Sequence, residues 1–512
     1  HLKTATRNLK NDYLTGATSL RDFYQYPIQT PDFQSIIKNK SRESIDRKLL
    51  QEVIREQYQG LPDYDLVNKN IELLGQENTF TVTTGHQLVL FGGPLFTTYK
   101  VLSTIKLARE LSEQFSSYNI VPIFWIHTED HDYEEINHFY TSFFDKKTYP
   151  GNFQSKVGDH ILEDAIQGMV PEHLPENLKN AFRPGIPLAQ AYREFMHHLF
   201  GPYGVVMLDA DDPRLKKKFE NVIKEEIHDS IAYKQVSKIS QDLDQAGYKL
   251  QIAPREINLF FLDQAGRNRI ISSNGGFSAV DRDLNWTTKE MDDMIVNNPG
   301  HFSPNVSLRP LYQESILPNL CYFGGWGELS YWLQLKGIFD HFGVNFPLLL
   351  PRMSATIYTR KQWNKWQELG FSPEDINHSV HEVFRKYVHR IWDDGPYQAL
   401  KSNITASIEA LREYTENEIA QTLSRSVDAQ KTKMNNFFGN FEKKIHRVIR
   451  ADNPKIFREI EELKNELQPD RMVQERQLSL GAFPDFSPES IIAEAWKHCS
   501  PLDFSHRYII LD

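Results

Sequence analysis

The sequence has little cysteine, no long hydrophobic run and no excess of positive charge. Only two cysteines, Cys321 and Cys499, occur in 512 residues, which excludes a disulfide framework and favours a reducing cytosol. No apolar stretch approaches the ~20 residues that cross a bilayer. A net charge of −10, from 58 basic and 68 acidic residues, argues against a nucleic-acid binder held by counterion release. We therefore expect a cytoplasmic protein whose partners are neither membranes nor nucleic acids.

The length of the chain and the changes in its character indicate several domains. A chain of 512 residues exceeds what one hydrophobic core usually organises. We expect an N-terminal segment and the first half of an α/β core in residues 1–145, and an inserted region with a third strand and a hairpin in 146–300. Residues 301–379 should complete the core, 380–475 should form a coiled coil, and 476–512 should dock back on the core.

A strand, a glycine-rich turn, a helix and a second strand follow one another between Thr79 and His138. The helix carries apolar residues at close to the helical period. Residues 120–126 are almost continuously apolar, as in a parallel strand that is buried on both faces. Polar residues follow both strands directly, and a third strand ends in the acids of 209–212. Open α/β sheets bind ligands at such strand ends, so we expect the functional site there.

The turn after the first strand has the composition of an anion site. Glycine lets backbone N–H groups approach a phosphate or a carboxylate closely. A histidine there can donate a hydrogen bond to charge that develops on a phosphoryl oxygen. The alternative is that these residues only cap and close a tight turn. The candidates are Thr84, Gly85, His86 and Gln87, followed by Gly92, Gly93 and Lys100.

Acids and histidines crowd behind the second strand, where Glu129, Asp130, His131 and Asp132 follow His127. Two histidines four residues apart, with carboxylates between them, would suit a metal ion on one helical face. They come directly after a strand, however, and neither cysteine is near in sequence, so we assign no metal site. A substrate pocket, in which carboxylates hold an amine and His131 acts as acid or base, fits better. A solvated loop is the alternative.

A third group of candidates lies in the last part of the α/β region. Glycines at 324–327 let the backbone come close to a bound group, and Glu328 could bind an amine. Arg352 follows a strand and could form a fork for a carboxylate or a phosphate. The alternative is structural, because glycine-rich turns and surface arginines are common. Arg309 and Trp326 complete this group.

Residues 404–448 carry apolar side chains at spacings of three and four over many turns. This pattern indicates one long helix with a coiled-coil seam. Asp452-Asn-Pro454 should end it, and a shorter helix should then fold back antiparallel on the first. We interpret the stripe as a packing surface and expect a homodimer through the coiled coil.

Several long blocks in a fixed order resemble one known family. They are TGHQLVLFGGPLFTTYK, VPIFWIHTEDHDYEEINH, RPLYQESILPN, GGWGELSYWLQLK and PRMSAT, followed by the helical stripe and a short element at Gln474–Gln477. In this order they are similar to the bacillithiol-biosynthesis cysteine-adding enzymes. The resemblance implies an α/β fold with a Rossmann-like, nucleotidylyltransferase-type core, connecting-peptide insertions and a dimerising coiled coil.

The resemblance also implies a reaction, the last step of bacillithiol biosynthesis. A ligase of this kind adds L-cysteine to glucosaminyl-malate through an amide bond. Because amide formation in water requires activation, we expect ATP or another nucleotide as co-substrate, and a metal that takes part would be Mg²⁺ bound with the nucleotide. The alternatives are a nucleotidylyltransferase-like enzyme that acts on another small metabolite and a nucleotide-sensing coiled-coil scaffold.

Roles for the candidate residues follow as hypotheses, with His86, Asp130 and His131 as the catalytic candidates. Residues 84–87 and the two glycines at 92–93 would hold a phosphate or the malyl carboxylates, with His86 stabilising developing charge. Residues 129–132 would position the amine, and one of them would take its proton. Arg352 and Glu328 would orient the cysteine. In the synthetase relatives that the resemblance implies, a HIGH-type turn and a KMSKS-type loop hold ATP. Residues 84–87 lack the second histidine of the former, and Pro351–Thr356 lacks the lysines of the latter.

Overall fold

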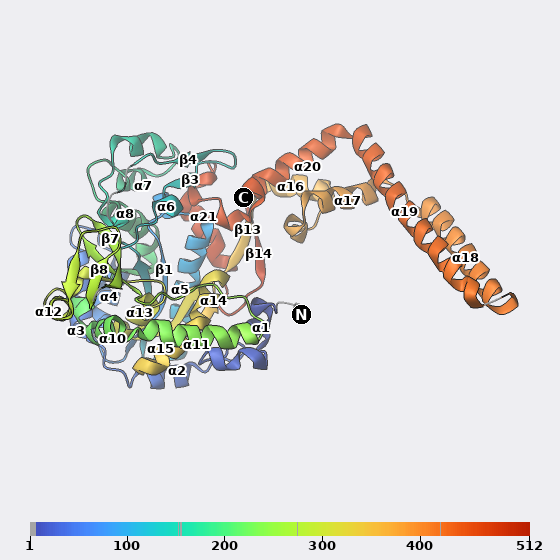
Figure 1. Ribbon diagram of the computed structural model, residues 1–512. Helices are drawn as coiled ribbons and strands as arrows, with labels where there is room; N and C mark the ends of the chain where they lie inside the picture. The colour runs from blue at the N-terminus through green and yellow to red at the C-terminus, as the bar shows by residue number, and fades with distance from the viewer. Residues whose placement is uncertain (1–6, 152, 154–155, 274, 420) are drawn as a thin grey trace. The chain divides into compact units, whose positions relative to one another are not determined.

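The computed structural model describes residues 7–151, 153, 156–273, 275–419 and 421–512, which form two compact units (Figure 1). The first unit comprises His1–Ala355 and Glu475–Ile509, and the second comprises Thr356–Gln474 and Ile510–Asp512. The second unit therefore begins at Thr356, ahead of the boundary expected at residue 380. In the part of the chain that the structure describes, no helix is long and apolar enough to span a bilayer.

The first unit is organised by a parallel five-stranded sheet with the strand order β12-β11-β1-β2-β5. The chain runs outward from β1 through β2 to β5 on one side, and through β11 to β12 on the other. The strand order therefore reverses between β1 and β11, as in doubly wound Rossmann-like folds. The strands are β1 (Thr79–His86), β2 (Asn119–Ile126), β5 (Val206–Asp209), β11 (Asn319–Gly324) and β12 (Leu348–Pro351).

The central strand β1 is buried along almost its whole length although it is rich in threonine. Thr81 and Thr83 donate their hydroxyl hydrogens to Asn319 Oδ1 of the neighbouring strand β11, at 3.2 and 2.8 Å. A buried hydroxyl needs a partner, and β-branched residues favour strands. These threonines therefore satisfy both requirements at the centre of the sheet.

Helices cover the sheet and connect its strands. The helix α5 (Leu95–Gln114) joins β1 to β2 and packs on both, while α4 (Asp65–Leu74) packs on β1, β2 and β5. Asp46 caps α3, its side chain accepting a hydrogen bond from the N–H of Leu49. The remaining helices of this unit are α1 (Leu9–Thr15), α2 (Phe33–Lys40), α3 (Arg47–Gln57), α6 (Tyr133–Ile136), α7 (Glu176–Ala181), α8 (Leu188–Phe200), α9 (Pro213–Lys217), α10 (Glu220–Asp229), α11 (Ile231–Gln245), α12 (Thr288–Asn297), α13 (Arg309–Ile316), α14 (Trp326–Gln334), α15 (Lys336–Phe342) and α21 (Pro488–His498).

A second sheet is inserted between β5 and β11 and is antiparallel, with the order β10-β6-β7-β8-β9. The expected hairpin within it is confirmed, because β6 and β7 pair from Phe260↔Arg269 to a tight turn at Asp263↔Gly266. Its strands are β6 (Leu259–Asp263), β7 (Gly266–Ser273), β8 (Gly276–Ala279), β9 (Asn285–Thr287) and β10 (Phe302–Pro304). A separate small hairpin is formed by β3 (His138–Tyr140) and β4 (Lys146–Thr148).

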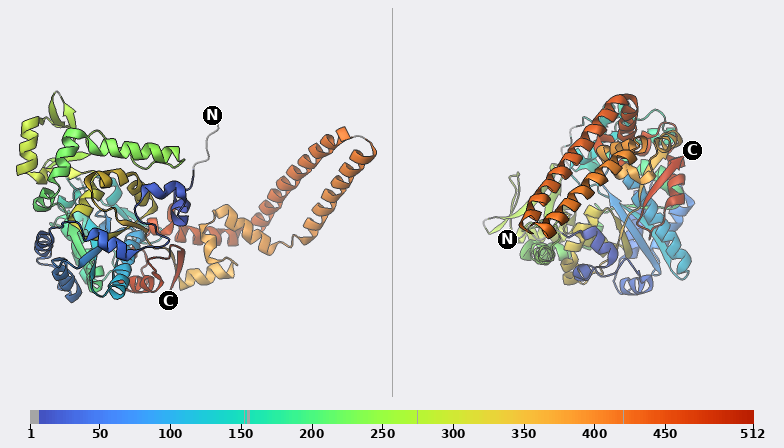
Figure 2. Two further views of the ribbon diagram at one scale, coloured as in Figure 1. Left: turned by 90° about the horizontal axis from the view of Figure 1, so that it is seen from below. Right: turned by 90° about the vertical axis from the view of Figure 1, so that its right-hand side faces the viewer.

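The second unit contains a helical hairpin rather than the single long helix that the apolar stripe predicted. The helix α18 (Gly395–Glu418) is followed by α19 (Ser424–Asp452), and the two lie side by side in Figure 1 and in the left view of Figure 2. Ion pairs from Lys401 to Glu442 at 2.8 Å and from Arg412 to Asp428 at 3.1 Å show that they run antiparallel. The turn was not predicted because the apolar period continues through it and the sequence has no glycine or proline there to mark it.

The shorter helix that follows also differs from the prediction. The helix α20 (Pro454–Leu467) packs on α17 through Phe457, whose ring lies 5.1 Å from that of Phe384, and does not lie along α19 (Figure 1). The break predicted at Asp452-Asn-Pro454 is confirmed. The other helices of this unit are α16 (Arg360–Glu368), α17 (Val380–Ile391), α18 (Gly395–Glu418) and α19 (Ser424–Asp452); the strands β13 (Ser354–Thr359) and β14 (His506–Leu511) complete the chain.

Candidate active site

The carboxyl ends of β1 and β11 meet at the point where the strand order reverses, which is where open α/β sheets bind ligands. His86 is the last residue of β1, and Gly324 is the last residue of β11. The third strand end, that of β2, lies beside β1 and is followed by the cluster at residues 127–132. Members of all three groups predicted from the sequence therefore lie at one edge of the sheet.

An ion pair between a buried lysine of α5 and a partly exposed glutamate of α14 lies at the reversal point. Lys100 of α5 places Nζ 2.5 Å from Glu328 Oε2 and donates to the Gly85 carbonyl at 2.9 Å. The Lys100 side chain is only 2% exposed. Glu328 also accepts hydrogen bonds from the N–H of Gly325 at 2.8 Å and from the Tyr322 hydroxyl at 3.1 Å. Burial alone would raise the pKa of Glu328, but Lys100 and the Gly325 N–H outweigh it, so the carboxylate stays ionised.

The His86 imidazole is uncharged at neutral pH. Burial lowers its pKa to about 3, and the positive charge of Lys100 acts in the same direction. Its Nε2 is shielded from solvent and has no hydrogen-bond partner among the described residues. The ring lies edge-on to Phe96, with centroids 4.9 Å apart. A buried nitrogen without a partner is costly in a folded protein, and a bound ligand would supply one.

Arg352 faces the same aromatic ring from another direction. Its guanidinium carbon lies 5.1 Å from the Phe96 centroid. Nη2 donates to Glu475 Oε1 at 2.8 Å and Nη1 donates to the Met353 carbonyl at 2.8 Å, while Nε has no partner among the described residues. Glu475 also accepts from the Ser354 hydroxyl and the Ala355 N–H, each at 3.0 Å. These contacts fix the guanidinium and leave one donor available.

Asp130 is the carboxylate of the second cluster that is held toward the sheet. Gln87 donates through Nε2 to Asp130 Oδ2 at 2.9 Å, and the N–H of His131 donates to Oδ1 at 2.8 Å. Burial would raise the pKa of Asp130, but the Gln87 hydrogen bond and the charges of Arg309 and Arg267 lower it below its usual value. Asp130 is therefore ionised and directly linked to the turn after β1.

His131 and Asp132 lie toward solvent. The His131 side chain is 49% exposed, and Asp132 is exposed. The His131 Nδ1 lies 3.0 Å from Arg267 Nη1 and accepts its hydrogen bond, because a guanidinium can only donate. The neutral ring then carries its hydrogen on Nε2. Burial and Arg267 lower the pKa of His131, which favours this neutral form.

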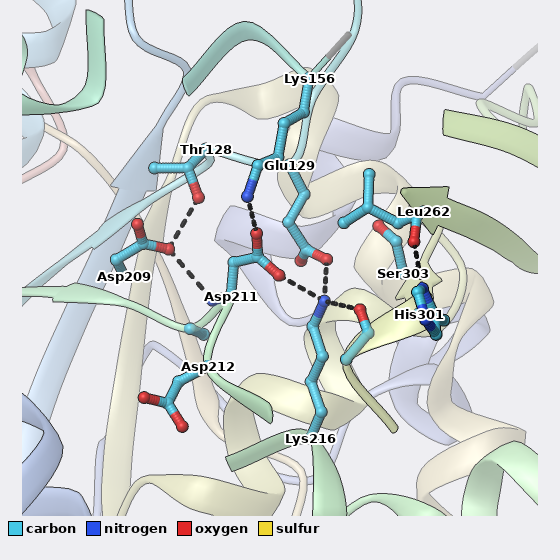
Figure 3. Close-up of polar contacts among 12 residues, drawn as sticks. Thr128, Glu129, Lys156, Asp209, Asp211, Asp212, Lys216, Leu262, His301 and Ser303 are labelled. Atoms are coloured by element: carbon cyan, nitrogen blue, oxygen red, sulfur yellow. Dashed lines mark hydrogen bonds and ion pairs between the residues drawn. The ribbon is translucent and has the colours of Figure 1, made fainter. Parts of the chain in front are cut away.

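Glu129 belongs to a network of charged side chains at the ends of β2 and β5 (Figure 3). Lys216 places Nζ 2.5 Å from both Glu129 Oε1 and Asp211 Oδ1, and 3.2 Å from the Gly300 carbonyl. Lys156 forms a second ion pair with Asp211. Thr128 donates its hydroxyl to Asp209 Oδ1 at 2.7 Å. The ammonium of Lys216 thus has an acceptor for each of its three hydrogens.

A small cavity lies between this network and Asp130. Its volume is about 20 Å³, room for about one water molecule. Its polar lining consists of His127, Glu129, Asp130, Asp211, Arg267 and Arg309. A substrate group larger than water can enter only if these side chains move apart.

Several residues predicted from the sequence lie away from these groups. The Thr84 hydroxyl donates to the Phe323 carbonyl within the sheet, at 2.8 Å. A side chain on Gly92 would lie 3.0 Å from Phe195, and one on Gly93 would lie 3.0 Å from Val89, so both glycines allow close packing with apolar residues. Trp326 contacts the N-terminal helix, with Lys10 Nζ 5.5 Å from its ring centroid.

Four residues of the site were not among the predicted site residues. Lys216 and Asp211 follow β5, Arg267 lies on the inserted hairpin, and Glu475 comes from the C-terminal segment. The acids at 209–212 after a strand were a visible signal, and Lys216 follows them by about one helical turn. Arg267 and Glu475 had no such signal, because their distance from the strand ends along the chain is large.

The described residues contain no group of three or more histidine, cysteine, aspartate or glutamate side chains placed to hold a metal ion.

Two family profiles together match nearly the whole chain. One is described as "Bacillithiol biosynthesis BshC, N-terminal Rossmann-like domain" and matches residues 2–353. The other is described as "Bacillithiol biosynthesis BshC, C-terminal coiled-coil domain" and matches residues 355–511. The two matches meet close to Ala355, where the first segment of the first compact unit ends.

Curated relatives match over the same length. A protein of Christiangramia forsetii is 36% identical over 97% of this chain and 96% of its own, and one of Flavobacterium johnsoniae is 34% identical over 98% and 97%. Both bear the name "Putative cysteine ligase BshC". A solved structure described as "putative arginyl t-RNA synthetase" from Campylobacter jejuni covers 85% of this chain and 100% of its own, at 8% identity. Its TM-score of 0.23 is too low to support any statement about the fold.

Proposed function

Because the chain belongs to the bacillithiol biosynthesis BshC family, we propose that it joins L-cysteine to glucosaminyl-malate by forming an amide bond, with ATP as the activating co-substrate. The curated relatives are named as cysteine ligases, and this chain aligns with them from end to end. The proposal therefore specifies both substrates, L-cysteine and glucosaminyl-malate, and the nucleotide.

The observation that supports an enzyme most directly is the pair of unpartnered donors beside buried cations at the reversal point of the sheet. His86 Nε2 and Arg352 Nε are both shielded from solvent without a partner among the described residues. Both side chains border Phe96, and Lys100 lies within the same group. Such donors, fixed before a ligand binds, stabilise negative charge that develops during acyl transfer.

The His86 side chain would act as a neutral hydrogen-bond donor. A pKa of about 3 means that it stays uncharged through the physiological range. It can therefore stabilise charge on an oxygen without itself exchanging a proton. Arg352 and Lys100 supply the positive charge near it, and each is held in place by a carboxylate, Glu475 and Glu328.

Asp130 is the residue best placed to receive the proton of the attacking amine. Among its neighbours, Glu129 is bound to Lys216, Asp132 is exposed, and the neutral form of His131 carries its hydrogen on Nε2. Asp130 is ionised, lines the cavity and is oriented by Gln87. It would hold the glucosamine nitrogen and accept its proton as the amide forms.

A nucleotide fits the donor set at the reversal point. The groups that would hold its phosphates are His86, Lys100 and Arg352, of which two are cations and two have an unpartnered N–H or ring nitrogen. When bound, ATP activates a carboxylate so that an amine can displace the activating group. Mg²⁺ would accompany the nucleotide, with ligands that come from the phosphates as well as from the protein.

A product assay tests the proposal directly. Purified protein is incubated with glucosaminyl-malate, cysteine and each nucleoside triphosphate in turn, and the products are identified by mass spectrometry. The expected result is the cysteine amide with one nucleotide by-product, AMP for adenylation or ADP for an acyl phosphate. A nucleotide attached to the metabolite in place of cysteine, or no product with any combination, would refute the proposed reaction.

The helical hairpin of the second unit supports a homodimer. Large apolar side chains remain exposed along both of its helices, among them Leu411 at 52% and Phe437 at 56%. Several large apolar side chains that stay exposed on one pair of helices are typical of an interaction site. Sedimentation velocity should give a dimer for the wild type and a monomer for the double variant Leu411→Glu with Phe437→Glu. A monomeric wild type would refute this part of the proposal.

A further inference from the structure

Two arginines from distant parts of the chain, both partly shielded from solvent, face the small cavity beside Asp130. Arg267 lies near the start of β7 on the inserted sheet, and Arg309 is the first residue of α13. Both line the cavity together with Asp130 and His127. The Arg267 side chain is only 8% exposed. A buried cation requires compensation by a counter-charge or by a ligand.

Arg267 is fixed by neutral partners. Nε donates to the Ser303 hydroxyl at 3.0 Å, Nη2 donates to the Pro304 carbonyl at 3.2 Å and Nη1 donates to His131. The guanidinium carbon lies 4.0 Å from the centroid of the Phe260 ring. Its contact with a carboxylate is a long one, 4.0 Å to Asp130 Oδ1. These contacts set the orientation of the fork but balance little of its charge.

Arg309 is in a similar position. Its hydrogen-bonding neighbour is the Tyr331 hydroxyl, which is uncharged because burial raises its pKa to about 12. Among the described residues it forms no ion pair within 4.0 Å, and Asp130 acts on it only from a distance. Asp130 thus serves as the counter-charge for both arginines.

The other carboxylates of the cavity are already matched. Glu129 and Asp211 share Lys216, and Asp211 also pairs with Lys156. Two guanidiniums and one carboxylate remain, which leaves one positive charge without a counter-ion. The cavity therefore has the charge to hold one anionic group, and its side chains must move apart to admit a group larger than water.

We propose that Arg267 and Arg309 form the subsite for a carboxylate of the substrate that carries the attacking amine. The inference rests on the proposed function, under which this group is a carboxylate of the malyl portion of glucosaminyl-malate. A guanidinium fork matches the planar carboxylate with two parallel hydrogen bonds. A single charge also fits better than the higher charge of a phosphate, because Asp130 repels any anion that enters. The subsite places the substrate next to Asp130, which would receive the proton of its amine.

Isothermal titration calorimetry on the full chain, without cysteine or nucleotide, tests the subsite through binding alone. Glucosaminyl-malate should bind the variants Arg267→Lys and Arg309→Lys about 10- to 100-fold more weakly than the wild type, because each loses a charge-assisted forked contact. The matched control is Arg282→Lys, an arginine of the same inserted region that pairs with Asp263 at the surface. Unchanged affinity in both variants would overturn the subsite.

A second arm changes the ligand and leaves the protein intact, so that it does not depend on how well a variant folds. The dimethyl ester of the malyl group should bind the wild type as weakly as glucosaminyl-malate binds the lysine variants. Equal binding of ester and acid would overturn the proposal. Malate should compete with glucosaminyl-malate and inorganic phosphate should not; competition by phosphate alone would make this a phosphate site.

The outcomes separate the subsite from the proposed reaction. If the wild type makes the cysteine amide but both variants bind glucosaminyl-malate normally, the reaction stands and the subsite is wrong. If the wild type makes no amide yet binds glucosaminyl-malate through both arginines, the subsite stands and the proposed reaction is wrong.

Discussion

Replacing Lys216 with methionine should destabilise the first unit strongly, because it removes one cation from between two buried carboxylates. Lys216 Nζ lies 2.5 Å from Glu129 Oε1 and 2.5 Å from Asp211 Oδ1, and its side chain is 2% exposed. Methionine keeps the volume and the apolar stem of the side chain but not its charge.

The size of the effect follows from the burial of the three groups. An exposed ion pair contributes about 0–1 kcal/mol, whereas removal of one partner from a buried pair costs about 3–5 kcal/mol. Lys216 is buried and Asp211 is almost so, and the substitution removes the ion-pair partner of Glu129 while Asp211 keeps Lys156. We therefore expect the free energy of unfolding to fall by about 3–5 kcal/mol near neutral pH.

The loss should depend on pH with a definite sign. Burial raises the pKa of Glu129, and Lys216 is the main group that opposes this. In the variant the folded-state pKa of Glu129 rises further above its unfolded value. Stability from a group with a raised pKa is present below the unfolded pKa, about 4.3 for glutamate, and is lost as pH rises through the folded pKa. The variant should therefore recover part of its deficit as the pH is lowered toward about 5.

Urea denaturation followed by far-UV circular dichroism at two pH values measures both effects. The matched control is Lys217→Met, because Lys217 is the next residue in the chain and its ion pair with Glu220 and its hydrogen bond to the Val296 carbonyl both lie at the surface. The control should lose no more than about 1 kcal/mol. A Lys216→Met variant no less stable than the control would refute the role of the network, and a deficit independent of pH would refute its electrostatic origin.

The remaining predictions concern turnover. His86→Ala should abolish formation of the amide product while circular dichroism remains that of the wild type; retained turnover would remove His86 from the mechanism. In the wild type, protonation of His86 should cause no inflection in the profile of kcat/KM between about pH 5 and 8, because its pKa is about 3. Asp130→Asn should lower kcat more than it raises the KM for glucosaminyl-malate, and an unchanged kcat would exclude Asp130 as proton acceptor. Glu475→Ala should lower kcat/KM about 10- to 100-fold by releasing Arg352, with partial recovery in Glu475→Gln; equal loss in both would indicate a structural role only.

Much of the core could be predicted from local sequence patterns. The apolar run at 120–126 and the β-prone run that begins at Thr79 form neighbouring parallel strands, and the first of them extends through Gly85 to His86. Periodicity identified these elements because each one buries a face or a whole strand, and burial leaves a regular pattern in the sequence. The same dependence on periodicity explains why the helical hairpin was missed. Its apolar period continues through the turn between α18 and α19, so the pattern indicated one helix.

The candidate site could be predicted only in part. Thr84–His86 prove to be the end of the first strand rather than a turn after it, and the acids at 129–132 follow the second strand, so their place at the carboxyl edge of the sheet was expected. Their partners could not be predicted. Lys216 and Arg267 reach Glu129 and His131 from other elements, and local spacing holds no information about such contacts.

By itself, the sequence determined the main strands and helices of the α/β core and the family of the chain, and it predicted a site at the strand ends. The tertiary structure alone decided the charge state and the pairing of the groups in that site. His86 is neutral because the fold buries it beside Lys100. Asp130 is ionised because Gln87 and two arginines surround it. The physical reason is that strand and helix patterns are local along the chain, whereas the pKa of a buried group depends on desolvation and on charges brought close only by folding.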